Sequence, residues 1–396
     1  MPLDFIGLFC GAGGLDLGFE SAGFRHALSM DIDPWSVLTL RDNRPGWDVA
    51  ECDIKEVSPV DLPDAEVILA GFPCQGFSLG GNRQGGDERN FLFQEVVRLA
   101  KARKPRYVVI ENVLNLRTMI EPSSGRPFVE IIEQAFERLG YHVKYNIFRV
   151  SGFGVPQTRR RFIFIASADP FPSGFHWPEP EMDTPAATYL DDIAANPSIV
   201  LPNHEPAWGF SSRVHVATGK PFDPSEQPVP CRFSRTGSDG HPIRSLSAPF
   251  PAVDTATVWG WAQGNVLAAR MKKDRINGKY IRNPTSEITL WRISASRLRS
   301  FTDREYARLQ TFPDSWVFHG GNKRHIHKQI GNAVPVQFAC RIARFLAALH
   351  DAQCHGKQMK SFAQTSGAQL EFDLCNFATI ERSVNIRPLS KTAVNS

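Results

Sequence analysis

The sequence predicts an α/β fold, with a doubly wound, mostly parallel sheet and a second, smaller, irregular domain. Short, apolar, β-branched runs at 4–9, 66–70 and 106–111 are typical of strands that are buried on both faces of a parallel sheet. Apolar residues recur at helical spacing over 90–103, between two of these runs, which gives the alternation of strand and helix that defines the class. Fifteen of the 29 prolines fall between 170 and 251, where this alternation ends.

The first domain is expected to cover residues 1–169. After the strand at 106–111, two further apolar runs at 141–150 and 161–167 indicate a final pair of strands. Open α/β sheets bind their ligands at the carboxyl ends of the strands. Motifs that follow these strands are therefore the first candidates for a functional site.

The remaining chain divides into three parts. We expect an irregular module of loops and short strands over 170–295, a helical segment that returns to the first domain over 296–350, and a partly disordered tail over 351–396. Residues 231–299 hold twelve Lys or Arg against four Asp or Glu, a local charge of +8, whereas the whole chain has a net charge of +4. Such a segment favours contact with a polyanion.

The composition excludes several classes of protein. With 42% hydrophobic and 22% charged residues among 396, the chain is globular rather than disordered, collagenous or coiled-coil. No apolar run approaches the roughly 20 residues of a membrane-spanning helix, and no secretory signal is evident, so a cytoplasmic setting is expected. Seven scattered cysteines disfavour disulfides and a metal site, and His325 and His327 are interpreted as a solvated pair.

A glycine-rich turn at residues 9–14 (FCGAGG) follows the first predicted strand. Glycines let the backbone approach a ligand closely, although a plain tight turn would look the same. The dinucleotide fingerprint needs a further glycine where this chain has Asp16, which disfavours a nicotinamide-dependent oxidoreductase. Asp31 and Asp53, at the expected ends of the next two strands, could accept hydrogen bonds from a ribose and an adenine amino group.

Two motifs at strand ends could supply a nucleophile and an acid. Residues 71–78 (GFPCQGFS) place Cys74 after the strand at 66–70, where a thiol can act as a nucleophile, although a lone cysteine is more often a small buried hydrophobe. If the strands at 66–70 and 106–111 are adjacent, Glu111 emerges at the same edge and could protonate a ring nitrogen as the thiolate attacks. The glycine-rich residues 78–90 are predicted to form a loop that closes over a phosphate-bearing substrate.

Three further motifs complete the set. In residues 157–161 (QTRRR), alternation along a strand would place Arg159 and Arg161 on one face, where they could bind a base carbonyl or a phosphate. An isolated charged triplet is usually solvated. Residues 304–314 (REYARLQTFPD) and 329–335 (QIGNAVP) indicate a capped helix and a turn into a helix, and neither suggests a function by itself.

Taken together and in this order, these motifs resemble the DNA (cytosine-5)-methyltransferase family. The resemblance covers most of residues 4–350 and skips a module between roughly 170 and 290, where that family carries its variable target-recognition region. It implies the fold of S-adenosylmethionine-dependent methyltransferases and a bacterial modification-type enzyme. Such an enzyme uses S-adenosyl-L-methionine to methylate C5 of a specific cytosine in double-stranded DNA. The resemblance also implies a monomer and a restriction–modification system, in which a cognate endonuclease could act on the same site.

The resemblance assigns a role to each matching residue. Cys74 would add to C6 of the cytosine, and Glu111 would contact N3 and the exocyclic amine. Arg159 and Arg161 would hold the base, with Arg161 at its carbonyl oxygen. The cofactor would be bound by a set from several motifs: Phe9, Gly11, Gly13, Gly14, Asp31, Asp53, Phe72 and Asn332.

Two positions depart from the pattern of the family. Asp31 stands where the family usually has Glu, and Asp33 is a neighbouring candidate for the same role. Gly7 stands where many members have Asp. Neither departure affects the chemistry at Cys74.

The chemistry that the resemblance implies needs a thiol and an extruded base. C5 of cytosine is a poor nucleophile, and addition of a thiolate at C6 makes it electron-rich. The base has to leave the duplex to be reached, and phosphate contacts from the basic module would offset the cost of flipping.

Two alternatives stay open at this point: a tRNA cytosine-5 methyltransferase on the same scaffold, and a non-catalytic DNA-binding relative. The long basic module favours duplex DNA over RNA. The presence of Cys74, Glu111 and Asn332 disfavours loss of catalysis. Residues 255–265, which contain two tryptophans, are either a contact segment or a small local core.

Overall fold

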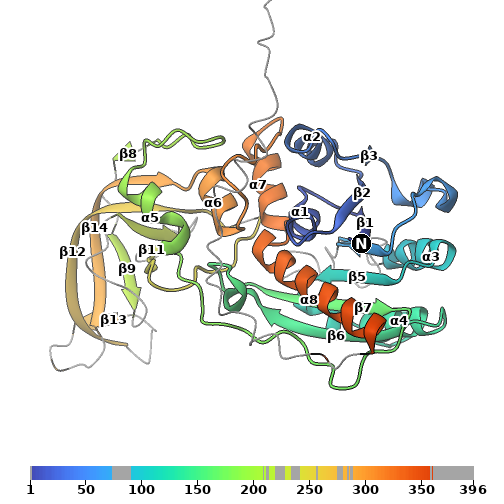
Figure 1. Ribbon diagram of the computed structural model, residues 1–396. Coiled ribbons are helices and arrows are strands. Elements are labelled where there is room, and N and C mark those ends of the chain that lie inside the picture. The colour runs from blue at the N-terminus through green and yellow to red at the C-terminus, as the bar shows by residue number, and fades with distance from the viewer. Residues whose placement is uncertain are drawn as a thin grey trace, which may run out of the picture.

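The computed structural model contains two sheets joined by a group of short helices (Figure 1). It describes residues 2–73, 91–207, 209–210, 214–218, 228–232, 241–255, 257–273, 280–282, 285, 289–356 and 359. Cys74 and the predicted loop at 78–90 lie outside the described residues, as does nearly all of the predicted tail. In the described part of the chain, no helix has both the length and the apolar character needed to cross a bilayer.

The first sheet has the strand order β3-β2-β1-β4-β5-β7-β6. Its strands are β1 (Asp4–Leu8), β2 (Arg25–Asp31), β3 (Val49–Glu51), β4 (Val67–Ala70), β5 (Tyr107–Asn112), β6 (His142–Arg149) and β7 (Arg160–Ser167). Neighbours from β3 to β5 pair in parallel, and β7 runs antiparallel to both β5 and β6. The predicted doubly wound, mostly parallel sheet is confirmed, and the strands at 66–70 and 106–111 are indeed adjacent.

Helices cover both faces of this sheet. They are α1 (Gly14–Ser21), α2 (Pro34–Asn43), α3 (Phe93–Arg103), α4 (Phe128–Glu137) and α8 (Val336–His355). One face packs against α3 and α4 through Val96, Phe128 and Phe136. The other packs against α1 and α8, and α8 is the C-terminal segment that returns to the first domain. The helix predicted at 90–103 is therefore found as α3, and α8 begins within the helical segment predicted over 296–350. Both helices bury the sheet.

The module predicted to be irregular contains the second sheet. Its path is β10-β12-β14-β9-β11, with β13 paired to β12 and β8 to β14. The strands are β8 (Gly209–Phe210), β9 (Val214–Thr218), β10 (Val229–Arg232), β11 (His241–Pro242), β12 (Trp259–Lys273), β13 (Tyr280–Arg282) and β14 (Thr289–Ser300). We call the antiparallel pair β12–β14 the ribbon; it is the long two-stranded feature at the left of Figure 1. The predicted boundary at 295/296 falls inside β14.

Three helices connect the two sheets: α5 (Ala187–Ala195), α6 (Asp303–Leu309) and α7 (Lys323–Asn332). Trp259 and Trp261, at the start of β12, are 3% and 0% exposed and pack with Phe250 and Phe301. Of the two interpretations of residues 255–265, the local core therefore holds for both tryptophans. The same core includes Leu40 of α2, so the second sheet is rooted in the first domain.

The interpretation of His325 and His327 as a solvated pair is wrong. Both lie on α7, and both rings pack against aromatic neighbours. His325 stacks on Trp35 at 5.7 Å between ring centroids, and His327 meets the Tyr306 ring edge-on at 4.6 Å. Burial lowers the pKa of His327, as expected for a packed imidazole.

Candidate active site

A cavity of about 250 Å³ opens at the carboxyl ends of β1, β2 and β3. Its walls come from the ends of these strands and from Pro73 and Leu92, which lie on either side of the undescribed residues 74–90. The full set is Phe9, Met30, Asp31, Ile32, Cys52, Asp53, Ile54, Lys55, Pro73 and Leu92. Three residues that the sequence assigned to a cofactor, Phe9, Asp31 and Asp53, are thus brought together. The position agrees with the rule that open α/β sheets bind ligands at this edge.

The Asp31 carboxylate is fixed at the wall of this cavity by the glycine-rich turn. The backbone N–H of Gly11 donates to its Oδ2 at 2.8 Å, and the N–H of Asp33 donates to its Oδ1 at 2.8 Å. Burial raises the pKa of Asp31, and these two N–H groups oppose the rise. A carboxylate oxygen can accept more than one hydrogen bond, so the Asp31 carboxylate remains able to accept from a ribose.

The structure separates the two candidates for the ribose position. Asp33 is the N-cap of α2, where its side chain accepts from the N–H of Trp35 at 3.1 Å. Asp31, not Asp33, lines the cavity. Asp53 lines the cavity and also caps a short turn through the N–H of Lys55.

The backbone around the turn fits a ligand that approaches closely. Phe9 has a φ of 56°, a left-handed conformation that costs energy for a residue with a side chain and that clusters at functional sites. A Cβ added to Gly11 would meet no described atom within 4 Å. Two carboxylates, apolar side chains around them and room beside Gly11 therefore fit a nucleoside that lies against the turn.

The C-terminal motif closes this end of the first domain. A Cβ added to Gly14 would lie 2.2 Å from the carbonyl oxygen of Val334, so glycine is required where α1 begins. Asn332, two residues earlier, is exposed at the end of α7 and is not among the residues around the cavity. Phe72 is buried and meets the Phe9 ring edge-on at 6.4 Å, which makes it a support for the wall.

Among the cavity residues that sequence reasoning missed are two isoleucines, Ile32 and Ile54. Ile32 directly follows Asp31, lines the cavity and is 65% exposed. Ile54 directly follows Asp53. The available signal was the identical pattern, an aspartate followed by isoleucine at the ends of two neighbouring strands.

A second group of residues lies where β4 and β5 end. Glu111 in β5 is 7% exposed, and a Cβ added to Gly71 would lie 4.0 Å from its Oε2. Gly71 stands three residues before Cys74. Asn112 ties the two segments together, because its Nδ2 donates to the carbonyl of Phe72 at 3.3 Å. The chain that leads to Cys74 is thus held beside the Glu111 carboxylate.

Arg161 is the ion-pair partner of Glu111. Nε of the arginine contacts Oε1 of the glutamate, and both side chains are more than nine-tenths buried. Burial raises the pKa of Glu111 and lowers that of Arg161, while their mutual attraction opposes both shifts. In both groups, desolvation outweighs attraction. This carboxyl group therefore holds a proton more readily than an exposed glutamate.

Arg159 points to a different set of partners. Its Nη1 donates to the carbonyls of Val253 and Gly331, at 2.6 and 2.8 Å. Arg159 is 6% exposed, whereas Arg160, between Arg159 and Arg161, is exposed. This agrees with the predicted alternation along the strand. Arg159 therefore joins β7 to α7 and to the segment that enters the ribbon, whereas Arg161 faces Glu111.

Two buried glutamines extend this junction. Gln157 accepts from the N–H of Val253 at 3.0 Å and donates to the Gln310 side chain at 2.9 Å. Gln310 in turn donates to the carbonyl of Ile330 at 2.7 Å. The motifs at 157–161, 304–314 and 329–335, which are far apart in sequence, thus meet in one hydrogen-bonded network.

The sequence matches the family of C-5 cytosine-specific DNA methylases over residues 3–347. The chain belongs to this family. It is therefore a DNA (cytosine-5-)-methyltransferase, and DNA is its substrate. Its fold is that of S-adenosylmethionine-dependent methyltransferases.

Curated relatives of this DNA methylase carry Type II names. The Type II methyltransferase M1.HphI of Haemophilus parahaemolyticus is 34% identical over 364 residues, which cover 87% of this chain and 86% of that protein. The Type II methyltransferase M.PspPI of a Psychrobacter strain is 32% identical over 350 residues, covering 88% and 79%.

Solved structures confirm the fold of this DNA methylase. A putative DNA modification methyltransferase encoded within an Escherichia coli prophage has a TM-score of 0.54 at 23% identity, and covers 88% of this chain and 99% of its own. A Spodoptera frugiperda DNMT2 mutant has a TM-score of 0.55 at 14% identity, with the same coverage. At these identities the likeness concerns the fold alone.

Proposed function

We propose that this enzyme methylates one cytosine within a short recognition sequence of double-stranded DNA, through a flipped base and a covalent bond between Cys74 and C6. The observation that carries the proposal is the buried Glu111–Arg161 pair at the sheet edge, beside Gly71 and the chain that leads to Cys74. The Type II names of the relatives support a place in a restriction–modification system beside a separate endonuclease. We propose that the methylase acts as a monomer.

Glu111 and Arg161 divide the work on the base. Because burial raises its pKa, the Glu111 carboxyl group can carry a proton and donate it to N3 of the base while the Cys74 thiolate adds to C6. Arg161, whose guanidinium group has further N–H donors, would bind the carbonyl oxygen of the ring. Addition of the thiolate at C6 removes the C5–C6 double bond and the aromaticity of the ring, and it makes C5 nucleophilic. Loss of the C5 proton later expels the thiolate and restores the ring.

The residues around the cavity would hold S-adenosyl-L-methionine. Asp31 would accept from its ribose, Asp53 would accept from its adenine amino group, and Ile32 and Ile54 would contact its apolar faces. Gly11 would let the backbone approach the cofactor. A Cβ on Gly13 or Gly14 would instead collide with Leu40 or Val334, so these two glycines support the turn from behind. Asn332 lies outside the residues around the cavity. The cofactor, when bound, supplies an electrophilic methyl group.

We assign Arg159 a supporting role in the same reaction. Its hydrogen bonds to Val253 and Gly331 keep β7 in place, and with it Arg161. The resemblance had Arg159 help hold the base and its surroundings, and the hydrogen bonds of Arg159 support the second part of that role.

Expression in a methylation-free bacterial host followed by bisulfite sequencing tests the proposed function. We expect methylated cytosines at one short sequence in host DNA, and none in a host that expresses Cys74→Ala. Parallel assays on purified duplex DNA and tRNA with labelled cofactor would separate the two polymers. Methylation of tRNA alone, or of DNA by the Cys74→Ala variant, would contradict the proposal.

A further inference from the structure

Helix α7 has an exposed basic face. Residues 315–350, which include this helix, contain five Lys or Arg and no Asp or Glu. Arg324, Lys328 and Asn332 follow one another at intervals of four residues, so they lie on one side of the helix, and all three are exposed. We call Arg324 and Lys328 the basic face. In the part of the chain that the structure describes, neither of these two side chains forms an ion pair.

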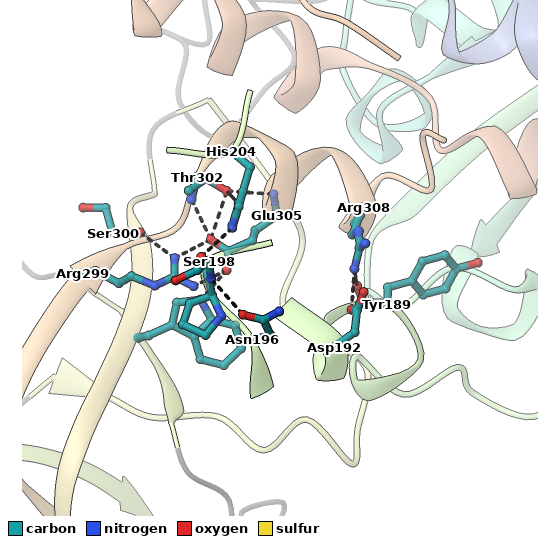
Figure 2. Close-up of polar contacts among 12 residues, drawn as sticks. Tyr189, Asp192, Asn196, Ser198, His204, Arg299, Ser300, Thr302, Glu305 and Arg308 are labelled. Carbon is teal, nitrogen blue, oxygen red and sulfur yellow. Dashed lines mark hydrogen bonds and ion pairs between the residues drawn. The ribbon is translucent and has the colours of Figure 1, made fainter. Parts of the chain in front are cut away.

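The arginines near this helix on the side of the ribbon are already engaged. Arg299 of β14 pairs with Glu305 of α6, and Arg308 of α6 contacts Asp192 of α5 (Figure 2). These guanidinium groups are buried and serve to join helices and strands to one another. The basic face differs from them in both respects, because its charges are exposed and have no protein partner among the described residues.

Other charged groups close to α7 leave the basic face unneutralised. Lys323, the remaining Lys or Arg of the helix, acts on Asp303 of α6, where its charge opposes the burial that raises the pKa of this carboxyl group to about 6. Asp254 lies on the opposite flank, and both of its carboxylate oxygens are bound by Thr257. Oδ1 accepts from the backbone N–H at 2.5 Å and Oδ2 from the hydroxyl at 2.8 Å. The two charges of the basic face are therefore available to an outside anion.

The basic face lies between the ribbon and the edge of the first sheet where the cavity opens. On one side, a Cβ added to Gly331 would lie 2.9 Å from the backbone of Asp254, in the segment that enters the ribbon. On the other side, His325 stacks on Trp35 in the first turn of α2, the helix that follows the strand end at the cavity. With 3.6 residues per turn, Lys328 projects midway between the directions of Gly331 and His325.

The C-terminal end of α7 is tied to the residues that would hold the base. The carbonyl of Gly331 accepts from Arg159 at 2.8 Å, and Arg159 stands two positions before Arg161, the partner of Glu111. A rise of 1.5 Å per residue puts the two residues of the basic face about 5 and 10 Å from Gly331 along the helix axis. A duplex that contacts the ribbon while one of its bases reaches Glu111 therefore has its backbone close to this face.

We propose that the basic face of α7 binds the phosphate backbone of the DNA substrate beside the methylated base, as a contact separate from the ribbon. Guanidinium and ammonium groups bind phosphate oxygens whatever the base sequence is. The inference rests on double-stranded DNA as the substrate. The ribbon would then provide preference among sequences, and Arg324 and Lys328 would hold the duplex against the junction of the two sheets.

A matched control for the charge exists on the first domain. Lys101, in the last turn of α3, and Arg138, the C-cap of α4, are exposed. Both stand shortly before the first residues of β5 and β6, at the edge of the sheet opposite to the cavity. The pair Lys101→Gln with Arg138→Gln therefore removes two positive charges, as Arg324→Gln with Lys328→Gln does, at a place that the proposed duplex does not reach.

The test measures dissociation constants for duplex DNA by fluorescence anisotropy. One duplex carries the recognition sequence found by bisulfite sequencing, the other an unrelated sequence, and salt is varied between about 50 and 200 mM. For Arg324→Gln with Lys328→Gln we expect both duplexes to bind about tenfold more weakly at the lower salt concentration. We expect the slope of log Kd against log salt to fall by about two, one for each lost phosphate contact. The control pair should keep the wild-type slope, and kcat at saturating DNA should stay within about twofold of wild type in both variants.

A swapped variant separates charge from structure. Arg324→Lys with Lys328→Arg keeps both charges and should keep the slope, which a structural role of either side chain would not predict. Because exposed substitutions rarely alter folding, the melting temperatures of all variants should match that of wild type. An unchanged slope in the glutamine variant, an equal change in the control pair, or weaker binding of the recognition duplex alone would overturn the proposal. Wild-type enzyme that binds no duplex DNA would refute the proposed substrate instead.

Discussion

Two buried glutamate–arginine pairs stand in different parts of the molecule, and their surroundings differ. Glu305–Arg299, at the root of the ribbon, is fully buried, and the carboxylate accepts from the arginine fork, an indole and a backbone N–H. Glu111–Arg161, at the edge of the first sheet, has one ion-pair contact, and within the described residues Oε1 of Glu111 accepts no further hydrogen bond.

This difference separates a pair that holds structure from a pair that does chemistry. A buried charge whose hydrogen bonds are all satisfied makes a rigid joint. A buried charge with unused capacity costs stability, and enzymes accept that cost where a substrate completes the set. The raised pKa of Glu111 is the electrostatic sign of this incompleteness.

The largest expected effect is on turnover in Glu111→Gln. The amide cannot hold a proton for N3, so we expect kcat to fall by about 10²–10⁴, the usual contribution of a general acid. Because Arg161 loses its ion-pair partner but the amide oxygen can still accept a hydrogen bond from it, thermal stability should fall only slightly. Glu95→Gln, which removes a glutamate that pairs with Arg98 on α3, serves as the control and should keep full activity.

The second prediction concerns stability, for which substitution of Glu305 should have a larger effect than substitution of Glu111. Glu305→Leu leaves Arg299 buried without its partner, and we expect it to lower the free energy of unfolding by about 3–5 kcal/mol. Glu111→Leu should lower it by much less, because Arg161 has the weaker partner to lose. Denaturant unfolding of both variants checks the order, and equal losses would remove the distinction between the two pairs.

The sequence predicts the Glu111 pair better than the Glu305 pair, for a physical reason. β4 and β5 are buried on both faces, so continuous apolar runs identify them, and the residues that follow them must meet at one edge. The placement of Glu111 needs only local pattern and that rule. Arg159 could not be placed in this way, because its partners Val253 and Gly331 lie 94 and 172 residues away.

Short strands were expected in the second module, but their pairing into one sheet with a long ribbon was not, because these strands lack a repeating apolar pattern. Trp261 and Arg299 meet Glu305 only after β12 and β14 have paired across the intervening residues. The motif at 304–314 likewise indicated a capped helix, which is correct, but its role appears only through contacts with distant segments.

A third buried carboxylate extends the comparison to a group held by a hydroxyl rather than a guanidinium. Asp16 accepts from Ser29 at 3.2 Å, and burial raises its pKa to about 7. Since its pKa is raised on folding, Asp16 favours the native state most below about pH 4, and this contribution is lost as the pH rises to 7. The free energy of unfolding of Asp16→Asn, relative to that of wild type, should therefore increase by a few kcal/mol as the pH rises from 4 to 8.

His26 provides the internal check on that pH dependence. It contacts Ser29 at 2.8 Å, and burial lowers its pKa to about 4. Its contribution has the opposite sign: it is present above about pH 6.5 and is lost as the pH falls through 4. The melting temperature of Asp16→Asn should thus rise with pH more steeply than that of wild type. Parallel profiles would show that Asp16 is ionised without penalty.

The smallest effect is expected for an exposed pair. Arg25 contacts Asp4 through two nitrogens at 2.5 Å, but the arginine side chain is 67% exposed. Water and salt screen such a pair, so Asp4→Asn should change the free energy of unfolding by less than about 1 kcal/mol. A loss comparable to that in Glu305→Leu would mean that burial does not decide the strength of these contacts.

Covalent trapping on DNA tests the central claim most directly, because it reports bond formation rather than turnover. A duplex with 5-fluorocytosine at the methylated position is incubated with enzyme and cofactor, and the product is digested and analysed by mass spectrometry. We predict a stable conjugate at Cys74, formed also by Glu305→Gln and strongly reduced in Glu111→Gln. Absence of the conjugate in wild-type enzyme that still methylates DNA, or its attachment to another residue, would contradict the account.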